Sequence, residues 1–323
     1  MSDTVLDVHI SPERLLEDLR ADVRQGLTAS PKWLSPKWFY DAAGSELFEK
    51  ITELPEYYPT RTERALIEAH AYDIAERTDA AILVELGSGS SEKTRLLLAA
   101  GVKHGSLHKY VPQDVSPSAL TGAIEQISQE FPALQLQGIV SDFTDTLQNL
   151  PADGRRTIAF LGGTLGNLIP EERAEFLSDI GGALVSDEFL LLGVGLVIDP
   201  DVLVPAYDDA AGVTASFNAN VLSVLNTRLG ADFDPAKFAH VALWNSEDEW
   251  IEMRLRATEA HHVSIADLGL DIDFEAGEEL RTEISAKFRR EGIERELVDA
   301  GFGIDEFWTD PQDRFALILA RRS

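Results

Sequence analysis

A short apolar run followed by a glycine-rich turn places the strongest constraint on how this chain can fold. Residues 82–86 read Ile-Leu-Val-Glu-Leu, residues 87–91 read Gly-Ser-Gly-Ser-Ser, and a leucine-rich run with helical character continues to Leu98. The first run lacks the alternation of a half-exposed strand, which is typical of a strand buried on both faces. We expect Ser90 or Ser91 to cap the helix. Strand, turn and helix predict the first unit of a doubly wound α/β domain, which binds ligands where such a strand ends.

The glycine turn does not match the usual nucleotide-binding patterns. A dinucleotide site needs GxGxxG, but Glu92 stands at the third glycine position, where its carboxylate would oppose a phosphate. The pattern GxxxxGK[ST] does not occur in the sequence either. An acidic residue just before the turn, Glu85, suits S-adenosylmethionine (SAM), whose amino-acid end carries an ammonium and whose sulfonium is cationic. The alternative is a tight turn that binds nothing.

The composition excludes several classes of function. The chain of 323 residues has 28 Lys and Arg against 56 Asp and Glu, a net charge of -28 that would repel phosphate backbones and anionic membranes. Without cysteine, the chain has no disulfides, thiol catalysis or cysteine-based metal site. No apolar stretch approaches the length of a membrane span, and no basic region precedes an apolar run at the N-terminus. We therefore expect a cytoplasmic protein that binds neither nucleic acid nor membrane.

Two further predicted strands end in residues that suit a nucleoside. Residues 109–116 read as a strand that ends in Asp114, about 20 to 25 residues past the turn, where an acid commonly accepts ribose hydroxyls. Residues 134–140 predict a third strand, and Asp142 and Phe143 follow it. This acid and ring could read an adenine amino group and stack on the base. Capping of a helix by Asp142 is the alternative.

The pattern changes after about residue 196. Before the turn we expect a helix from Pro12 to about 30, capped by Ser11. After the third strand we expect a strand at 157–161, a glycine-rich loop to Asn167, a helix at 170–184, a strand at 189–194, a long helix at 204–229, antiparallel strands within 240–288, a helix at 290–300 and a hairpin within 303–320. The order predicts an α/β core with an insertion between its fifth strand and its last helix and hairpin.

Two aromatic segments and one histidine pair need separate interpretation. Residues 38–40 read Trp-Phe-Tyr and residues 57–58 read Tyr-Tyr, both among prolines. Tyrosines with polar tips often line small-molecule sites, although packing between domains is an equal alternative. Adjacent His261 and His262 would point to opposite faces of a strand and cannot share an ion, so we expect no metal.

Taken together, three segments resemble the histidine-specific methyltransferase family. They are residues 36–41, 54–63 and 84–94, and the resemblance extends from about Arg24 to the C-terminus through residues 206–214 and 240–245. It implies a class I (Rossmann-like) SAM-dependent methyltransferase core with a second α+β substrate-binding domain, formed by the N-terminal segment and the insertion. The implied domains are a SAM-binding domain of residues 62–196 plus 288–323, and a histidine-binding domain of residues 9–61 plus 197–287.

The resemblance also implies an activity. It is the trimethylation of the α-amino group of L-histidine to hercynine, the first step of ergothioneine biosynthesis, with SAM as methyl donor and no metal. The alternatives are a same-family enzyme for another aromatic amino acid or amine, and a non-catalytic sensor of histidine or SAM. A nicotinamide dehydrogenase is disfavoured by the missing third glycine. We favour a monomer.

The implied site residues fall into two sets. The cofactor residues are Gly87 and Lys93 for the methionine part, Asp114 for the ribose, and Asp142 with Phe143 for the adenine. The substrate residues are Tyr57, Glu283 and Ser285 for the imidazole, Tyr40, Asn167 and Tyr207 for the α-amino and carboxylate ends, Phe48 against the ring, and Met253 among the residues that read the substrate. Tyr40 and Asn167 would act at the amine, and no dedicated base is evident. Tyr40 is a candidate proton relay, and release of the proton to water is the alternative.

One position departs from the family pattern. Gly195 stands where the family usually has an acid after the fifth strand. If that acid supports the cofactor or substrate loop, we expect weaker affinity here.

Overall fold

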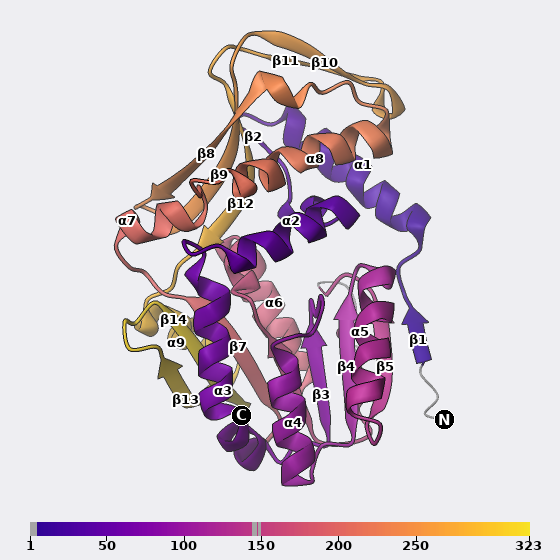
Figure 1. Ribbon diagram of the computed structural model, residues 1–323, viewed down its shortest axis with the longest axis vertical. Helices are drawn as coiled ribbons and strands as arrows, with labels where there is room; N and C mark the ends of the chain where they lie inside the picture. Colours follow the sequence, from indigo (N-terminus) through magenta and orange to yellow (C-terminus); the bar gives the residue numbers. More distant parts are fainter. Residues whose placement is uncertain (1–4, 144–146, 148–149) are drawn as a thin grey trace. The chain divides into compact units, whose positions relative to one another are not determined.

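The computed structural model describes residues 5–143, 147 and 150–323, which form two compact units (Figure 1). The chain leaves the first unit after Ser11 and returns to it at Arg61. It leaves again after Leu196 and returns at Phe288. The second unit therefore consists of Pro12–Thr60 and Val197–Lys287.

The first unit is built on an eight-stranded sheet with the order β1-β5-β4-β3-β6-β7-β14-β13. Its strands are β1 (Val5–Val8), β3 (Ile82–Leu86), β4 (Lys109–Asp114), β5 (Gln135–Val140), β6 (Arg156–Phe160), β7 (Phe189–Gly195), β13 (Phe302–Thr309) and β14 (Phe315–Arg322). Strands β1 to β7 of this sheet pair in parallel, and β14 is antiparallel to both β7 and β13. The strand order reverses beside β3, because β4 lies on one side of it and β6 on the other. Open α/β sheets bind their ligands at such a reversal.

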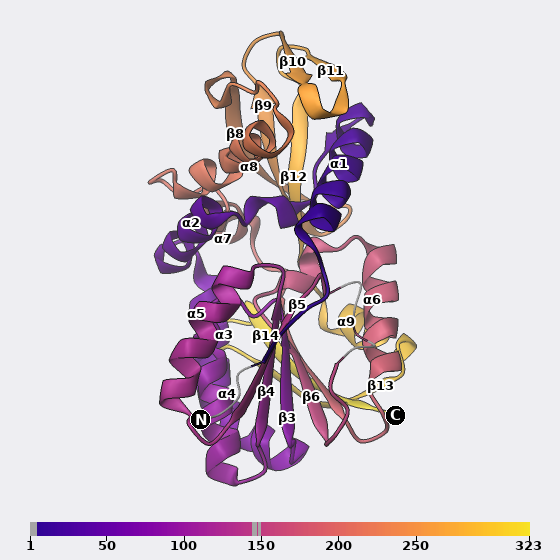
Figure 2. The same cartoon turned by 90° about the vertical axis from the view of Figure 1, so that its right-hand side faces the viewer.

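Helices cover both faces of this sheet (Figure 2). On one face lie α3 (Tyr58–Thr78), α4 (Thr94–His104) and α5 (Pro117–Glu130), and on the other α6 (Pro170–Ala183) and α9 (Arg290–Asp299). This double cover explains why every residue of β3, β6 and β7 is buried and why those strands read as continuous apolar runs. The predicted doubly wound core is therefore confirmed.

The second unit contains a four-stranded sheet with the order β2-β12-β9-β8 and a separate two-stranded sheet. The strands are β2 (Lys32–Trp33), β8 (Phe238–Asn245), β9 (Trp250–Ala257) and β12 (Glu279–Ala286), with β10 (His261–Ile265) and β11 (Leu270–Phe274) in the small sheet. The helices are α1 (Pro12–Thr28), α2 (Ala42–Glu53), α7 (Pro200–Leu203) and α8 (Val213–Leu229). The core of this unit contains Val221 and Leu225 of α8 and Ile251, Met253 and Leu255 of β9.

A β-bulge at Thr282 divides β12 into two parts that face opposite ways. Before the bulge, Glu279 lies opposite Arg256 on β9, and after it Glu283 lies opposite Met253. Residues directly opposite in an antiparallel pair share a face of the sheet. Without the extra residue, simple alternation would place Glu279 and Glu283 on one face. The bulge instead puts Glu283 on the face that carries the buried Met253.

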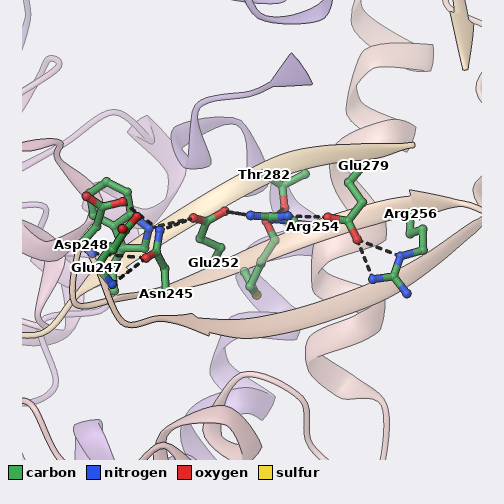
Figure 3. A network of polar contacts seen from close by, with 10 residues as sticks. Asn245, Glu247, Asp248, Glu252, Arg254, Arg256, Glu279 and Thr282 are labelled. Atoms are coloured by element: carbon green, nitrogen blue, oxygen red, sulfur yellow. Dashed lines mark hydrogen bonds and ion pairs between the residues drawn. The ribbon is translucent and has the colours of Figure 1, made fainter. Parts of the chain in front are cut away.

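The other face of β9 and β12 carries a ladder of charged side chains (Figure 3). Arg254 donates hydrogen bonds to Glu252 at 2.6 and 2.9 Å and to Glu279 at 2.5 Å. Glu279 also accepts from Arg256 at 2.8 Å, and Glu252 from Trp250 at 2.8 Å. Burial raises the pKa of Glu252, but the hydrogen bonds from Trp250 and Arg254 outweigh it and the net shift is downward. Arg254 is therefore the central cation of the ladder.

Two predicted helix starts are wrong. Helix α4 begins at Thr94 without a side-chain cap from Ser90 or Ser91, because Ser91 has a φ of 54° and still belongs to the turn. The long helix expected from 204 begins at Val213. The carboxylate of Asp209 accepts hydrogen bonds from the backbone N–H of Val213 at 3.0 Å and of Thr214 at 2.7 Å, which fixes the first turn there.

Other predicted elements match the structure. Ser116 caps α5, and its hydroxyl accepts from the backbone N–H of Ala119. The antiparallel strands after residue 238 and the C-terminal hairpin are confirmed. Strand β1 was not predicted, since four residues are too few for a periodic signal. His262 is exposed on β10 and pairs with Asp271 and Asp273. Among the described residues, no helix combines the length and hydrophobicity of a membrane span.

Replacing Arg254 by methionine should destabilise the protein by about 3 kcal/mol, because Glu252 and Glu279 lose their shared cation while Glu252 stays buried. The difference from the wild type should shrink as the pH falls below about 4, since carboxylates with a lowered pKa stabilise above their unfolded pKa and lose this effect as they are protonated. Urea denaturation at several pH values measures both effects.

Arg256→Met is the matched control, because Arg256 is half-exposed and contacts only the outer end of the ladder. It should cost less than about 1 kcal/mol. Equal losses in the two variants would contradict a central role for Arg254.

Candidate active site

The glycine turn after β3 leaves open space beside its backbone. Gly87 and Gly89 have φ values of 64° and 50°, and a Cβ placed on either would meet nothing within 4 Å. The hydroxyl of Ser88 between them is buried and has no hydrogen-bond partner among the described residues. A left-handed backbone, free space and an unpaired buried hydroxyl are the features of a loop that receives a polar ligand.

Asp114, at the end of β4, is bonded to the glycine turn. One oxygen of its carboxylate accepts from the backbone N–H of Gly89 at 2.9 Å, and the other accepts from Ser116 at 2.9 Å. Burial raises the pKa of Asp114, and these backbone donors oppose that shift. The predicted ribose acceptor thus lies at the end of β4, bonded to the predicted loop. Its contact with a ribose stays a prediction.

Glu85 is buried on β3, just before the glycine turn. Its buried carboxylate accepts hydrogen bonds from the hydroxyls of Thr94 on α4 and Tyr110 on β4. Burial raises the pKa of Glu85 to about 7, although both hydroxyls lower it. The acid that precedes the turn therefore links β3, α4 and β4.

A buried acid that sequence reasoning did not assign holds Lys93. The carboxylate of Glu63 on α3 is fully buried, pairs with the ammonium of Lys93 and accepts from the backbone N–H of Gly162 at 2.7 Å. A Cβ on Gly193 would lie 2.0 Å from the same carboxylate, so a larger residue there would displace Glu63 from its present position. Glu63 lies in one of the three segments that carry the family resemblance, and that location was its only signal in the sequence.

The remaining cofactor predictions lie at the ends of neighbouring strands. Gln113 on β4 donates to the backbone oxygen of Asp142 at 3.4 Å. The ring of Phe143 packs 5.2 Å from that of Phe160 and 5.4 Å from that of Phe176. Their contacts with an adenine stay predictions.

Asn167 and Gly195 also belong to the first unit. Asn167 ends the short helix η3 (Thr164–Asn167), so it lies in a different unit from the other predicted substrate residues. Gly195 ends β7, and its backbone oxygen accepts from Phe288 at 2.9 Å. The backbone of Gly195 is thus part of the sheet, and its effect on affinity stays a prediction.

The second unit gathers the predicted aromatic substrate residues into one cluster. Tyr40 lies 5.6 Å from Phe48, Phe48 lies 6.3 Å from Tyr57, and Tyr57 lies 6.2 Å from Tyr207, measured between ring centroids. Burial and the neighbouring Tyr207, Tyr40 and Glu283 raise the pKa of Tyr57 well above its ordinary value. Tyr57 is therefore a neutral hydroxyl at neutral pH.

Three polar side chains form a closed triangle at the edge of this cluster. The hydroxyls of Tyr207 and Ser285 lie 2.8 Å apart, and the Nζ atom of Lys287 donates to them at 2.9 and 2.7 Å. Sequence reasoning missed Lys287. Its spacing from Glu283 and Ser285, two residues each, was the available signal, because residues i and i+2 of a strand share a face.

A buried network fixes the position of Tyr207. The ring of His240 on β8 donates from Nε2 to the backbone oxygen of Tyr207 at 2.8 Å and accepts at Nδ1 from Asn218 at 2.8 Å. Asn218 on α8 in turn accepts from the hydroxyl of the bulge residue Thr282 at 2.6 Å. One buried amide thus connects Tyr207 to the bulge that orients Glu283 and Ser285.

A comparison with protein families decides the class of the protein. The model of the family described as "Histidine-specific methyltransferase, SAM-dependent" matches residues 19–322. The chain belongs to this family. The methyltransferase is 51% identical to the histidine N-alpha-methyltransferase of Mycolicibacterium smegmatis, over 97% of this chain and 98% of that protein. It is 49% identical to the histidine N-alpha-methyltransferase of Mycobacterium tuberculosis, over 94% and 95% of the two chains.

The fold is also found among solved structures. A SAM-dependent methyltransferase from Clostridium acetobutylicum matches with a TM-score of 0.50 at 11% identity, covering 86% of this chain and 98% of that one. At this identity the similarity shows the fold alone, and it confirms the predicted methyltransferase fold.

Replacing Glu63 by glutamine should lower the affinity for SAM about tenfold, because the amide keeps the shape of the side chain but no longer carries the charge that holds Lys93. Glu68→Gln on the exposed side of α3 is the matched control and should leave the affinity unchanged. Calorimetric titration with SAM measures both. A folded Glu63→Gln protein with wild-type affinity would contradict this role.

Proposed function

We propose that this methyltransferase transfers methyl groups from SAM to the α-amino nitrogen of L-histidine and carries the reaction through to hercynine. The observation that supports it best is the placement of Glu283 and Ser285 on the Met253 face of the sheet, beside the aromatic cluster. An acid, a hydroxyl and aromatic rings together suit an imidazole. The named relatives act on histidine, which supports the same substrate here.

The residues of the first unit fit SAM. Gly87 leaves space for the methionine part, the buried hydroxyl of Ser88 lacks a partner among the described residues, and Asp114 offers carboxylate oxygens to ribose hydroxyls. Lys93 would hold the carboxylate of the methionine part, with Asp142 and Phe143 at the adenine. When bound, SAM supplies a methyl group activated by its bond to a cationic sulfur.

The imidazole subsite depends on complementary hydrogen bonds. A neutral imidazole has one N–H donor and one acceptor nitrogen. Glu283 can accept the N–H, and the hydroxyls of Tyr57 and Ser285 can donate to the other nitrogen. Phe48 and Met253 would pack on the ring. An indole or phenyl ring leaves at least one of these polar groups unpaired, and such a site rejects it strongly.

Positioning of the amine is the main catalytic task of the protein. The attacking nitrogen must present a lone pair, so it must lose its proton before each methyl transfer. The hydroxyl of Tyr40 and the amide of Asn167 can orient the amine without enclosing it, which three successive methylations require. Tyr40 is 43% exposed, so it can pass a proton towards solvent. We favour direct loss to water over this relay.

The decisive experiment is mass spectrometry of L-histidine incubated with the purified protein and SAM. We expect three successive methyl additions that end at the trimethyl product, because nothing proposed here encloses the amine after the first. No mass gain despite calorimetric binding of histidine would instead support a sensor. No gain and no binding would overturn the assignment of substrate.

Replacing Glu283 by alanine should reduce activity on L-histidine by about 100-fold and increase the relative activity on L-tryptophan, because the imidazole N–H loses its acceptor while space opens for an indole. Rates on both amino acids, measured by mass spectrometry, test this. Glu247→Ala, which removes an exposed acid from the same unit, is the control. Unchanged activity on histidine in Glu283→Ala would refute the imidazole subsite.

We also propose that the protein acts as a monomer in the cytoplasm and as part of ergothioneine biosynthesis, without a metal. Light scattering after size-exclusion chromatography tests the oligomeric state. Activity in the presence of a metal chelator tests the last point and should be unchanged.

A further inference from the structure

We propose that Asn220 on α8 is a positioning residue for the methylation reaction, because its side chain fixes the backbone turn that carries Tyr40. The proposal rests on the proposed function, in which the hydroxyl of Tyr40 orients the amine of the substrate. Asn220 and Tyr40 both belong to the second unit. Asn220 would affect the amine through that tyrosine, not by contact with the substrate.

Tyr40 is the tyrosine of the aromatic cluster that is least fixed by packing. It is 43% exposed, whereas Tyr57 and Tyr207 are 8% and 7% exposed. The ring centroids of Phe48 and Phe217 each lie 5.6 Å from that of Tyr40, and both contacts are edge to face. An exposed side chain keeps much of its conformational freedom. The direction of the Tyr40 hydroxyl therefore depends strongly on the backbone at this residue.

The backbone at Tyr40 forms an inverse γ-turn. Tyr40 has a φ of -90° and a ψ of 54°, and the backbone N–H of Asp41 donates to the backbone oxygen of Phe39 at 3.1 Å. The short helix η1 (Pro36–Phe39) ends directly before this turn, and α2 begins directly after Asp41. A single hydrogen bond closes a γ-turn, so further contacts at its two ends decide whether it persists.

The side-chain amide of Asn220 connects the two ends of this turn. Its Nδ2 atom lies 2.8 Å from Oδ1 of Asp41 and 3.4 Å from the backbone oxygen of Phe39. Both oxygens are acceptors and an amide NH2 group has two N–H donors, so one donor is supplied to each end of the turn. The same oxygen of Asp41 also caps α2, since it accepts from the backbone N–H of Gly44 at 2.8 Å.

Phe217 supports the same segment from the same face of α8, because residues three apart on a helix are neighbours. Its ring centroid lies 4.6 Å from that of Phe39 and 5.6 Å from that of Tyr40. Gly44 allows the close approach of α2. A Cβ there would lie 1.7 Å from the backbone oxygen of Phe39 and 3.0 Å from Nδ2 of Asn220. Helix α8 therefore contacts both the ring and the backbone turn of Tyr40.

A displaced Tyr40 should slow methyl transfer more than it weakens substrate binding. The contacts proposed for the imidazole come from other residues and do not require Tyr40. Alignment of the amine with the methyl group does require it in this proposal, and small errors in such alignment cost rate. Loss of both amide donors of Asn220 should thus lower kcat and leave the KM for L-histidine nearly unchanged.

The test is a double-mutant cycle between Asn220→Leu and Tyr40→Phe. Leucine keeps the approximate size of asparagine and removes both donors, and phenylalanine removes only the hydroxyl. We expect Asn220→Leu to lower kcat for L-histidine about tenfold in the wild type and less than about twofold in Tyr40→Phe. In the wild type, KM should change by less than about threefold. A role in stability alone would cost the same factor of kcat in both backgrounds.

Asn226→Leu is the matched control, because Asn226 lies on the same helix and this variant also loses two hydrogen bonds to the backbone. The amide of Asn226 accepts from the N–H of Phe233 at 2.9 Å and donates to the backbone oxygen of Phe233 at 2.8 Å. Both leucine variants should lower the urea midpoint of unfolding. Asn226→Leu should keep the wild-type kcat within about twofold. Equal losses of kcat in the two variants would contradict the proposal.

Asn220→Ser keeps the proposal testable if Asn220→Leu does not fold. Serine offers one hydroxyl donor in place of two N–H groups and places no apolar bulk beside Asp41. This variant should lower kcat at least about threefold, and the loss should again disappear in the Tyr40→Phe background. Asn226→Ser is its control and should keep the wild-type kcat.

Three results would overturn the role of Asn220. They are wild-type kcat in the Asn220 variants, losses that multiply with the loss in Tyr40→Phe, and wild-type kcat in Tyr40→Phe itself. The wild type is assayed alongside with L-histidine and SAM. Absence of its turnover would refute the proposed function and this role together. Wild-type turnover with multiplying losses would refute the role of Asn220 alone.

Discussion

The extra residue in β12 is the constraint on which the polar organisation of the second unit depends. Because Thr282 is inserted between Arg281 and Glu283, the strand presents its first acid to the ladder around Arg254 and its second to the face of Met253. Without the bulge, β12 would place both of its acids, Glu279 and Glu283, on the same face of the sheet. The bulge residue Thr282 donates a hydrogen bond to Asn218, and Asn218 also contacts His240, which donates to the backbone oxygen of Tyr207. The position of the bulge at Thr282 and the position of Tyr207 are therefore coupled.

Both units bury polar and charged side chains. Those whose hydrogen bonds are all made inside the protein support the site, and those with unused hydrogen-bonding capacity are candidates for contact with a ligand. The buried carboxylate of Glu63 is bonded to Lys93 and to the backbone N–H of Gly162, and the oxygens of Glu85 are bonded to two hydroxyls. The hydrogen-bonding capacity of these two acids is satisfied inside the protein, so they support the site rather than bind a ligand. Ser88 and Lys287 differ, since each is buried and, within the described part of the chain, retains unused hydrogen-bonding capacity. Unused capacity of this kind is expected where a ligand completes the structure.

The sequence predicted much of the fold because the relevant signals are local. Continuous apolar runs marked β3, β6 and β7, the serine–proline pair marked the start of α5, and alternation marked the strands around β9. The helix starts that failed depend on contacts outside the local run. The backbone of Ser91 is left-handed within a tertiary turn, and Asp209 reaches forward to hold the first turn of α8. Periodicity contains no information on either.

Residue types and their order therefore determined the α/β class of the core, the insertion and, through the resemblance, the family. They also identified which side chains carry suitable chemistry, since an acid, a hydroxyl or an aromatic ring is recognisable without coordinates. Tertiary structure alone decided which of these side chains are paired and which are free. Glu63 reaches Lys93 across 30 positions of the chain, and Tyr207 reaches Lys287 across 80. Such pairings depend on how sheets and helices bring distant segments together, and on one inserted residue that reverses the direction of every side chain after it.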